Sequence, residues 1–76
     1  MNNRYSLNIM LSNQQADQSL IGVKLGKKCI KSGVPVAEVA SRLGVSRQTV
    51  YNWFVGAYEP KPEVALAISQ LLRKLK

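Results

Sequence analysis

The stretch VAEVASRLGVSRQTVYNWFVG, residues 36–56, predicts two short helices joined by a tight turn. The apolar residues of the first helix fall at i, i+3, i+4 and i+7, a spacing that places them on one inward face: Val36, Val39, Ala40 and Leu43. Gly44 suits the left-handed position that ends a helix, and Ser46 is a favourable N-cap for a second helix beginning at Arg47. Val45 can pack on Val50 across that cap, which fixes where the second helix begins.

The second helix, from Arg47 to about Val55, has one apolar and one polar face. Val50 and Trp53 lie at i and i+3 with Phe54 at their flank, and we expect this face to turn inward. The outward face then carries Arg47, Gln48, Tyr51, Asn52 and Val55. Arginine can bond guanine bidentately, and glutamine or asparagine can do the same to adenine. The pattern therefore predicts a helix that reads base edges in a major groove.

These features resemble the helix-turn-helix of the phage Cro and repressor family. The resemblance rests on the small Ala40 in the first helix, Gly44 followed by Val45 and Ser46 in the turn, and two core anchors in the second helix. It extends over residues 19–75, because a basic helix precedes the motif and a Pro-containing loop and a last helix follow it. It implies a small all-α bundle of four to five helices with a central helix-turn-helix.

The resemblance also assigns contacts with double-stranded DNA. It implies that bases are contacted by Arg47, Gln48 and Asn52, and bases or phosphates by Thr49, Tyr51 and Val55. It implies that phosphates are contacted by Ser46, Lys28 and Lys61. Pro35 and Val36 depart from the polar cap and Gln that many members carry, so we expect no phosphate contact from the start of the first motif helix. Val55 replaces a polar residue and could pack on a thymine methyl group.

Charge and composition agree with a nucleic-acid partner. The chain has 76 residues, enough for one small domain, and 46% of them are hydrophobic, as in globular proteins. Eleven Lys or Arg against four Asp or Glu give a net charge of +7, which favours a polyanion. An anionic membrane fits less well, because the apolar residues are divided among several short helices.

Several classes of function are disfavoured by missing residue types. The chain has no histidine and one cysteine, Cys29, so we expect no disulfide, zinc site, cofactor or catalytic cluster, and we predict that the protein is not an enzyme. We expect Cys29 to be a small buried residue. We also expect no small-molecule ligand. No apolar run resembles a signal peptide or membrane span, so we expect the cytoplasm of a bacterial host, in association with the nucleoid.

Three further segments complete the predicted domain. Asp17 or Ser19 could cap a helix that runs to about Ser32, where Gly33 would end it. Within it, glycines 22 and 26 suggest close packing against another helix, and the remaining surface carries Lys24, Lys27, Lys28 and Lys31, which could be only a solubilising face.

After the loop of residues 56–62, Glu63 opens a last helix whose inward stripe is Val64, Ile68, Leu71 and Leu75. A second contact surface could involve Ala65, Leu66 and Leu72.

The N-terminal residues 1–16 leave alternatives open. Apolar side chains alternate at Tyr5, Leu7, Ile9 and Leu11, which predicts a β-strand that pairs with the same strand of a second subunit. A frayed tail is an equal alternative, and an arm that carries Arg4 to the DNA is a third. We therefore divide the chain into an N-terminal arm or dimerisation strand, residues 1–16, and a helix-turn-helix domain, residues 17–76.

The functional prediction is a sequence-specific DNA-binding regulator, a repressor of phage or plasmid type that binds a pseudo-palindromic operator as a homodimer. We expect steric repression, because 76 residues leave no room for an effector domain. Dimerisation could use the N-terminal strand, the last helix or only the bound DNA. Two other functions fit the same motif: the DNA-targeting domain of a transposase or recombinase, and an antitoxin-like protein-interaction module.

Overall fold

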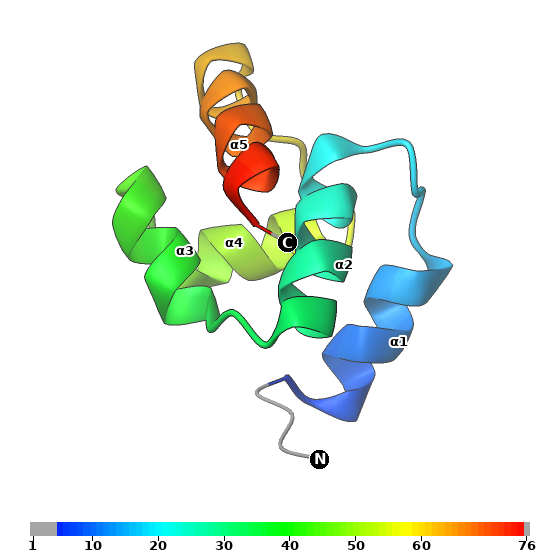
Figure 1. Cartoon of the computed structure of the whole chain (residues 1–76). Helices are drawn as coiled ribbons and strands as arrows, with labels where there is room; N and C mark the ends of the chain where they lie inside the picture. The colour runs from blue at the N-terminus through cyan, green and yellow to red at the C-terminus, as the bar shows by residue number, and fades with distance from the viewer. Residues whose placement is uncertain (1–4, 76) are drawn as a thin grey trace.

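The structure is a computed structural model and describes residues 5–75 (Figure 1). The described chain is all-helical, with the elements α1 (Leu7–Gln15), α2 (Ile21–Ser32), α3 (Val36–Leu43), α4 (Arg47–Phe54) and α5 (Pro62–Lys74). α2 is the central element, since it packs against α1, α4 and α5. In Figure 1, α4 passes behind α2, α3 lies on the left, α1 on the right and α5 above. The predicted all-α fold is confirmed.

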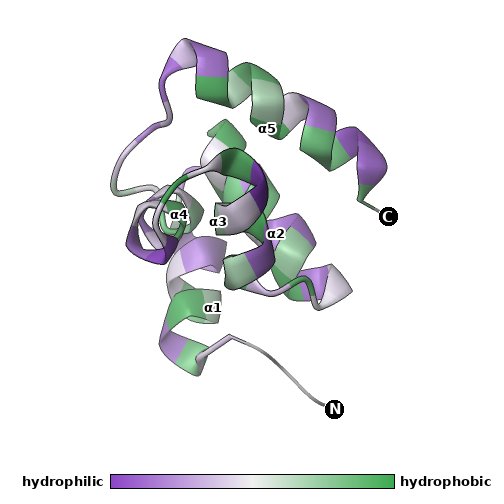
Figure 2. Cartoon of the chain, turned by 90° about the vertical axis from the view of Figure 1, so that its left-hand side faces the viewer, coloured by the Kyte–Doolittle hydropathy of each residue, from purple (hydrophilic) through white to green (hydrophobic). Residues whose placement is uncertain are grey.

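The core is built from the inward faces of these helices. Its most buried large side chains are Phe54, Leu25, Ile68, Val23, Val39 and Val50. Figure 2 shows hydrophobic residues on the helix faces that point toward one another and hydrophilic residues on the outer surface. Cys29 is buried as predicted, and burial, with a smaller effect of the Glu38 charge, raises the pKa of its thiol to about 12. Cys29 is therefore a packed, protonated core residue.

The predicted close packing at the two glycines of α2 is confirmed. A Cβ at Gly22 would lie 2.7 Å from Cβ of Trp53, and a Cβ at Gly26 would lie 2.8 Å from Cγ of Phe54. Both distances are shorter than non-bonded carbons tolerate. Glycine at these positions therefore allows the backbones of α2 and α4 to approach each other.

The predicted N-terminal β-strand is wrong, because residues 7–15 form α1 and no strand occurs among residues 5–75. Ser6 caps α1, its Oγ accepting a hydrogen bond from the backbone N–H of Ile9 at 3.2 Å. Contacts with the core recur at helical spacing: Ile9, Met10 and Asn13 face inward. The apolar residues Leu7 and Leu11 are instead 66% and 44% exposed, so the alternation does not mark one buried face. The frayed-tail alternative is wrong for these residues as well, and Arg4 lies outside the described residues.

The helix ends confirm some predicted caps and correct others. Gly33 and Gly44 end α2 and α3 with left-handed φ values of 73° and 68°, as expected. The predicted cap of α2 is wrong: its N-cap is Leu20, which makes no side-chain cap bond. The Asp17 carboxylate is used in the preceding turn, where it accepts from the N–H of Ser19 at 2.9 Å and from its Oγ at 2.6 Å. These bonds lower the pKa of Asp17. α5 begins at Pro62, one residue before the expected start.

Candidate nucleic-acid interface

The turn between α3 and α4 is held by local hydrogen bonds. Gly44 donates its N–H to the carbonyl of Ser41 at 3.3 Å, and Val45 donates to that of Ala40 at 3.0 Å. Ser46 caps α4, because its Oγ accepts from the N–H of Thr49 at 3.1 Å. The cap geometry thus confirms the predicted start of α4 and fixes its direction relative to α3.

The inward face of α4 is fixed in the core. Val50 and Phe54 are fully buried, and Trp53 is 5% exposed. The sequence predicted Val50 and Trp53 as the core anchors of this helix, with Phe54 at their flank. Because Phe54 lies against Gly26 of α2, rotation of α4 about its own axis would open the core. The opposite face of α4 is therefore held in a defined orientation toward solvent.

The outward face of α4 carries the predicted base-contacting residues. Arg47 and Gln48 are exposed, and Asn52 is half-buried. Gln48 donates from Nε2 to Oδ1 of Asn52 at 3.1 Å, so the two amides lie side by side one helical turn apart. Thr49 and Tyr51 are half-buried, and Val55, also half-buried, is the C-cap residue just beyond the helix. The structure thus brings Arg47, Gln48 and Asn52 together on one surface, while their contacts with bases stay a prediction.

The three residues predicted to contact phosphates lie in different places. Ser46 is exposed at the start of α4, and its Oγ also lies 2.8 Å from Oγ1 of Thr49. Lys61 is exposed at the N-cap of α5, after a loop tied back to α4 by the N–H of Ala57, which donates to the carbonyl of Asn52 at 2.9 Å. Lys28 is half-buried on α2, about 120° around that helix from Gly22, which lies against Trp53 of α4.

Sequence reasoning missed Asn13, which is the buried polar residue of the described chain. Its Nδ2 donates to the carbonyl of Phe54 at 2.7 Å and to that of Val23 at 3.0 Å. The last carbonyls of a helix lack donors within the helix, so this amide satisfies one of them at the end of α4. Nothing in the local sequence of α1 indicates the bond to Phe54, because Asn13 and Phe54 are 41 residues apart.

Tyr58 was also missed. Its side chain is 68% exposed in the loop that follows α4, and its N–H points back to the carbonyl of Asn52 at 3.4 Å. An aromatic residue within a Gly- and Pro-containing loop was the available signal. Tyr58 therefore adds a hydrogen-bonding hydroxyl to the surface at the end of α4.

The described residues contain no cluster of three or more His, Cys, Asp or Glu that could hold a metal ion. Within the same part of the chain, none of the helices has the length and apolar character required to cross a bilayer.

This arrangement, a capped helix that is anchored on one face and polar on the other, behind a tight turn, defines a DNA-binding helix-turn-helix protein. The sequence model of the helix-turn-helix family matches residues 25–74, which is more than half of the chain. The chain therefore belongs to this family, in its Cro/C1 type, and is a DNA-binding regulator. Neither the comparison with curated proteins nor the comparison with solved structures found a match. The family match begins within α2, so α1 lies outside it.

Proposed function

We propose that this protein is a sequence-specific repressor that inserts α4 into the major groove of an operator. The observation that carries the proposal is the outward row of Arg47, Gln48 and Asn52 on a helix whose other face is fixed in the core. Rigid presentation matters because base readout depends on bidentate hydrogen bonds, whose geometry tolerates little displacement.

The three side chains divide the readout between them. Arg47 would donate N–H groups from two of its guanidinium nitrogens to O6 and N7 of a guanine. The amides of Gln48 and Asn52 are held together by their mutual hydrogen bond, and each retains donors and acceptors for an adenine edge. Thr49, Tyr51 and Val55 flank this row and would contact bases or the backbone, while Ser46, Lys28 and Lys61 would contact phosphates. Repression then follows from occupation of a promoter.

The proposed binding unit is a homodimer. Two recognition helices related by a two-fold axis would enter successive major grooves about 34 Å apart and read a pseudo-palindromic site. An exposed apolar residue on α5 supports a subunit contact there: Leu66 is 63% exposed. The proposal places the protein in the cytoplasm, at the nucleoid, because that is where its DNA target would lie.

Selection of binding sites from random duplex DNA at about physiological salt tests the proposal. An inverted repeat with half-sites about one helical turn apart is the expected result. Binding without sequence preference would contradict a repressor and would favour an architectural role or a piece of a larger recombination machine. No binding to DNA would favour the protein-interaction function instead.

A further inference from the structure

α2 carries a row of cations on the side that faces away from α4. Gly22 lies against Trp53 of α4. At about 100° per residue, Lys24, Lys27 and Lys31 lie roughly 140° to 200° around the helix from Gly22. All three lysines are exposed. They span two turns, about 10 Å along the helix axis, and point away from the recognition helix.

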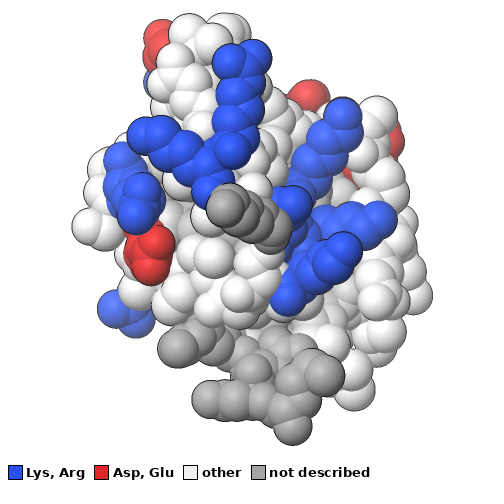
Figure 3. Space-filling view, in the orientation of Figure 1, with Lys and Arg blue, Asp and Glu red and all other residues white. Residues whose placement is uncertain are grey.

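The same side of the molecule includes the end of α5. Arg73 and Lys74 are exposed in its last turn, and α5 packs against α2. Figure 3 shows Lys and Arg side chains gathered over α2 and over the end of α5. We call this surface the cationic face and define it as Lys24, Lys27, Lys31, Arg73 and Lys74.

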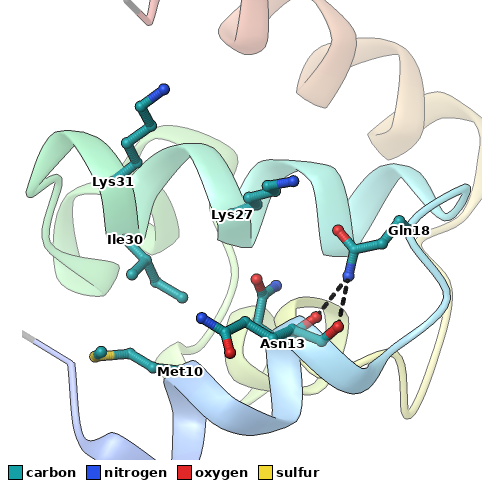
Figure 4. Close-up of a pocket in the computed structure, with 7 residues that line it drawn as sticks. Met10, Asn13, Gln18, Lys27, Ile30 and Lys31 are labelled. Atoms are coloured by element: carbon teal, nitrogen blue, oxygen red, sulfur yellow. Dashed lines mark hydrogen bonds between the residues drawn. The ribbon is translucent and has the colours of Figure 1, made fainter.

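Carboxylates do not neutralise the cationic face. The ion pair found within residues 5–75 joins Arg42 to Glu38 at 3.4 Å. Both residues belong to α3, so this pair involves no residue of the cationic face. Lys27 and Lys31 border the groove of about 340 Å³ between α1 and α2, and Figure 4 shows the side chain of Lys31 pointing away from α1 while that of Lys27 extends along α2. The ammonium groups therefore reach solvent and produce a local positive potential.

The cationic face and the outward face of α4 lie on opposite sides of the domain. In Figure 1, α4 passes behind α2, and in the turned view of Figure 2 the two helices lie on either side of α3. α4 carries one cation of its own, Arg47. Lys28, the α2 residue proposed to contact operator phosphates, lies about 120° around the helix from Gly22, at the flank between the two faces, so a duplex bound at α4 would reach it at the edge and leave Lys24, Lys27 and Lys31 uncovered.

We propose that the cationic face binds the phosphate backbone of a second DNA duplex, so that the protein can hold two DNA segments together. The proposal rests on operator binding through α4. Duplex DNA presents one negative charge per about 1.7 Å of its axis, an array that a row of lysines can follow without reading sequence. An anionic membrane fits less well, because the large apolar side chains exposed in the described chain are elsewhere: Leu7, Leu11, Tyr58 and Leu66.

A two-duplex capture assay tests this face. The protein is saturated with an immobilised duplex that contains the selected inverted repeat, so that the recognition helices are occupied, and a labelled duplex of unrelated sequence is added. Wild type should capture the second duplex. Lys24→Gln/Lys31→Gln should weaken this capture about tenfold or more and lower its salt slope by about two, since each phosphate-contacting lysine contributes about one. Operator affinity should change less than about twofold.

The matched control is Asn8→Glu/Gln15→Glu, which lowers the net charge by the same amount at two exposed residues of α1. Capture that survives in the control supports the cationic face. Three results would overturn the proposed second-duplex site: no capture by wild type, equal losses of capture in both variants, or binding of the protein to phosphatidylserine vesicles without binding to the second duplex. If no operator is selected, the proposed function fails by itself. Both variants are then compared on the unrelated duplex alone, where a larger loss in Lys24→Gln/Lys31→Gln supports the cationic face and an equal or smaller loss overturns it.

Discussion

At the scale of single residues, Arg47 is the side chain on which sequence preference should depend most. It is exposed at the first position of α4, and a bidentate bond to guanine contributes about 1–3 kcal/mol of discrimination. Arg47→Ala should therefore weaken operator binding by about 1–3 kcal/mol and relax the preference at one base pair. Titration of the selected operator and of single-base variants by fluorescence anisotropy measures both effects.

Lys28 provides the comparison for Arg47. Its side chain is half-buried on α2 and its predicted contact is with phosphate, so Lys28→Ala should weaken binding to all sequences alike. If Arg47→Ala also reduced binding to operator and random DNA equally, its assignment as a base-reading residue would be wrong.

Asn13 should contribute to stability through the end of the recognition helix. Its amide donates to the carbonyls of Phe54 and Val23, and the side chain is 2% exposed. Loss of a buried hydrogen bond costs about 1–3 kcal/mol, so Asn13→Ala should lower the free energy of unfolding by that amount. Asn13→Asp should cost more at neutral pH, because a carboxylate would face two carbonyl oxygens. Urea denaturation followed by circular dichroism measures both.

Gln18 is the matched control for Asn13. Its Nε2 also donates to backbone carbonyls, among them that of Asn13 at 2.8 Å, but its side chain is exposed. Gln18→Ala should therefore change stability by less than about 0.5 kcal/mol. Equal losses at Asn13 and Gln18 would show that burial does not decide the strength of these bonds.

At the scale of elements, the crossing of α2 and α4 depends on Gly22. An alanine there would place its Cβ 2.7 Å from Cβ and 2.9 Å from the carbonyl oxygen of Trp53, so α4 must shift. Overpacking costs about 1–3 kcal/mol and exceeds the gain of up to about 1 kcal/mol in helix propensity. Gly22→Ala should destabilise the fold and change the near-ultraviolet circular dichroism of Trp53, the single tryptophan.

Gly33→Ala separates packing from backbone strain. No atom lies within 4 Å of a Cβ at Gly33, but its φ is +73°. The substitution should cost about 1–2 kcal/mol through the left-handed backbone alone. The native signal of Trp53 should stay as in wild type. A changed Trp53 signal in Gly33→Ala, or an unchanged one in Gly22→Ala, would contradict this separation.

The elements also show what sequence reasoning can predict. α3 and α4 were predicted with their caps, because Gly44 and Ser46 act through hydrogen bonds to residues at most five positions away. The row on α4 followed from the same local periodicity. α1 was predicted as a strand because exposed leucines on its outer surface complete an apolar alternation. A short alternation of this kind does not show which side chains are buried in the core. The Asn13 bond depends on how α1 docks on α4, which no local pattern encodes.

At the scale of the whole molecule, the proposed dimer requires a surface that two copies can share. α5 exposes 63% of Leu66, while Ile68 and Leu71 on the same helix are buried. A charged side chain introduced at position 66 would lose its hydration in a subunit contact, which costs free energy. Leu66→Glu should therefore raise the concentration needed to half-saturate the inverted repeat by about tenfold or more. Binding to a single half-site should change little, since α4 is untouched.

Leu11→Glu tests whether α1 supplies this surface instead. Leu11 is 44% exposed, one turn from the exposed Leu7. Because both variants replace an exposed leucine by glutamate, they change net charge equally, and only the position of the subunit contact can separate them. Sedimentation velocity without DNA, together with titration of the inverted repeat, should show the dimer lost in Leu66→Glu and kept in Leu11→Glu. The reverse result would move the contact to α1, and a dimer that persists in both variants would mean that neither helix forms it.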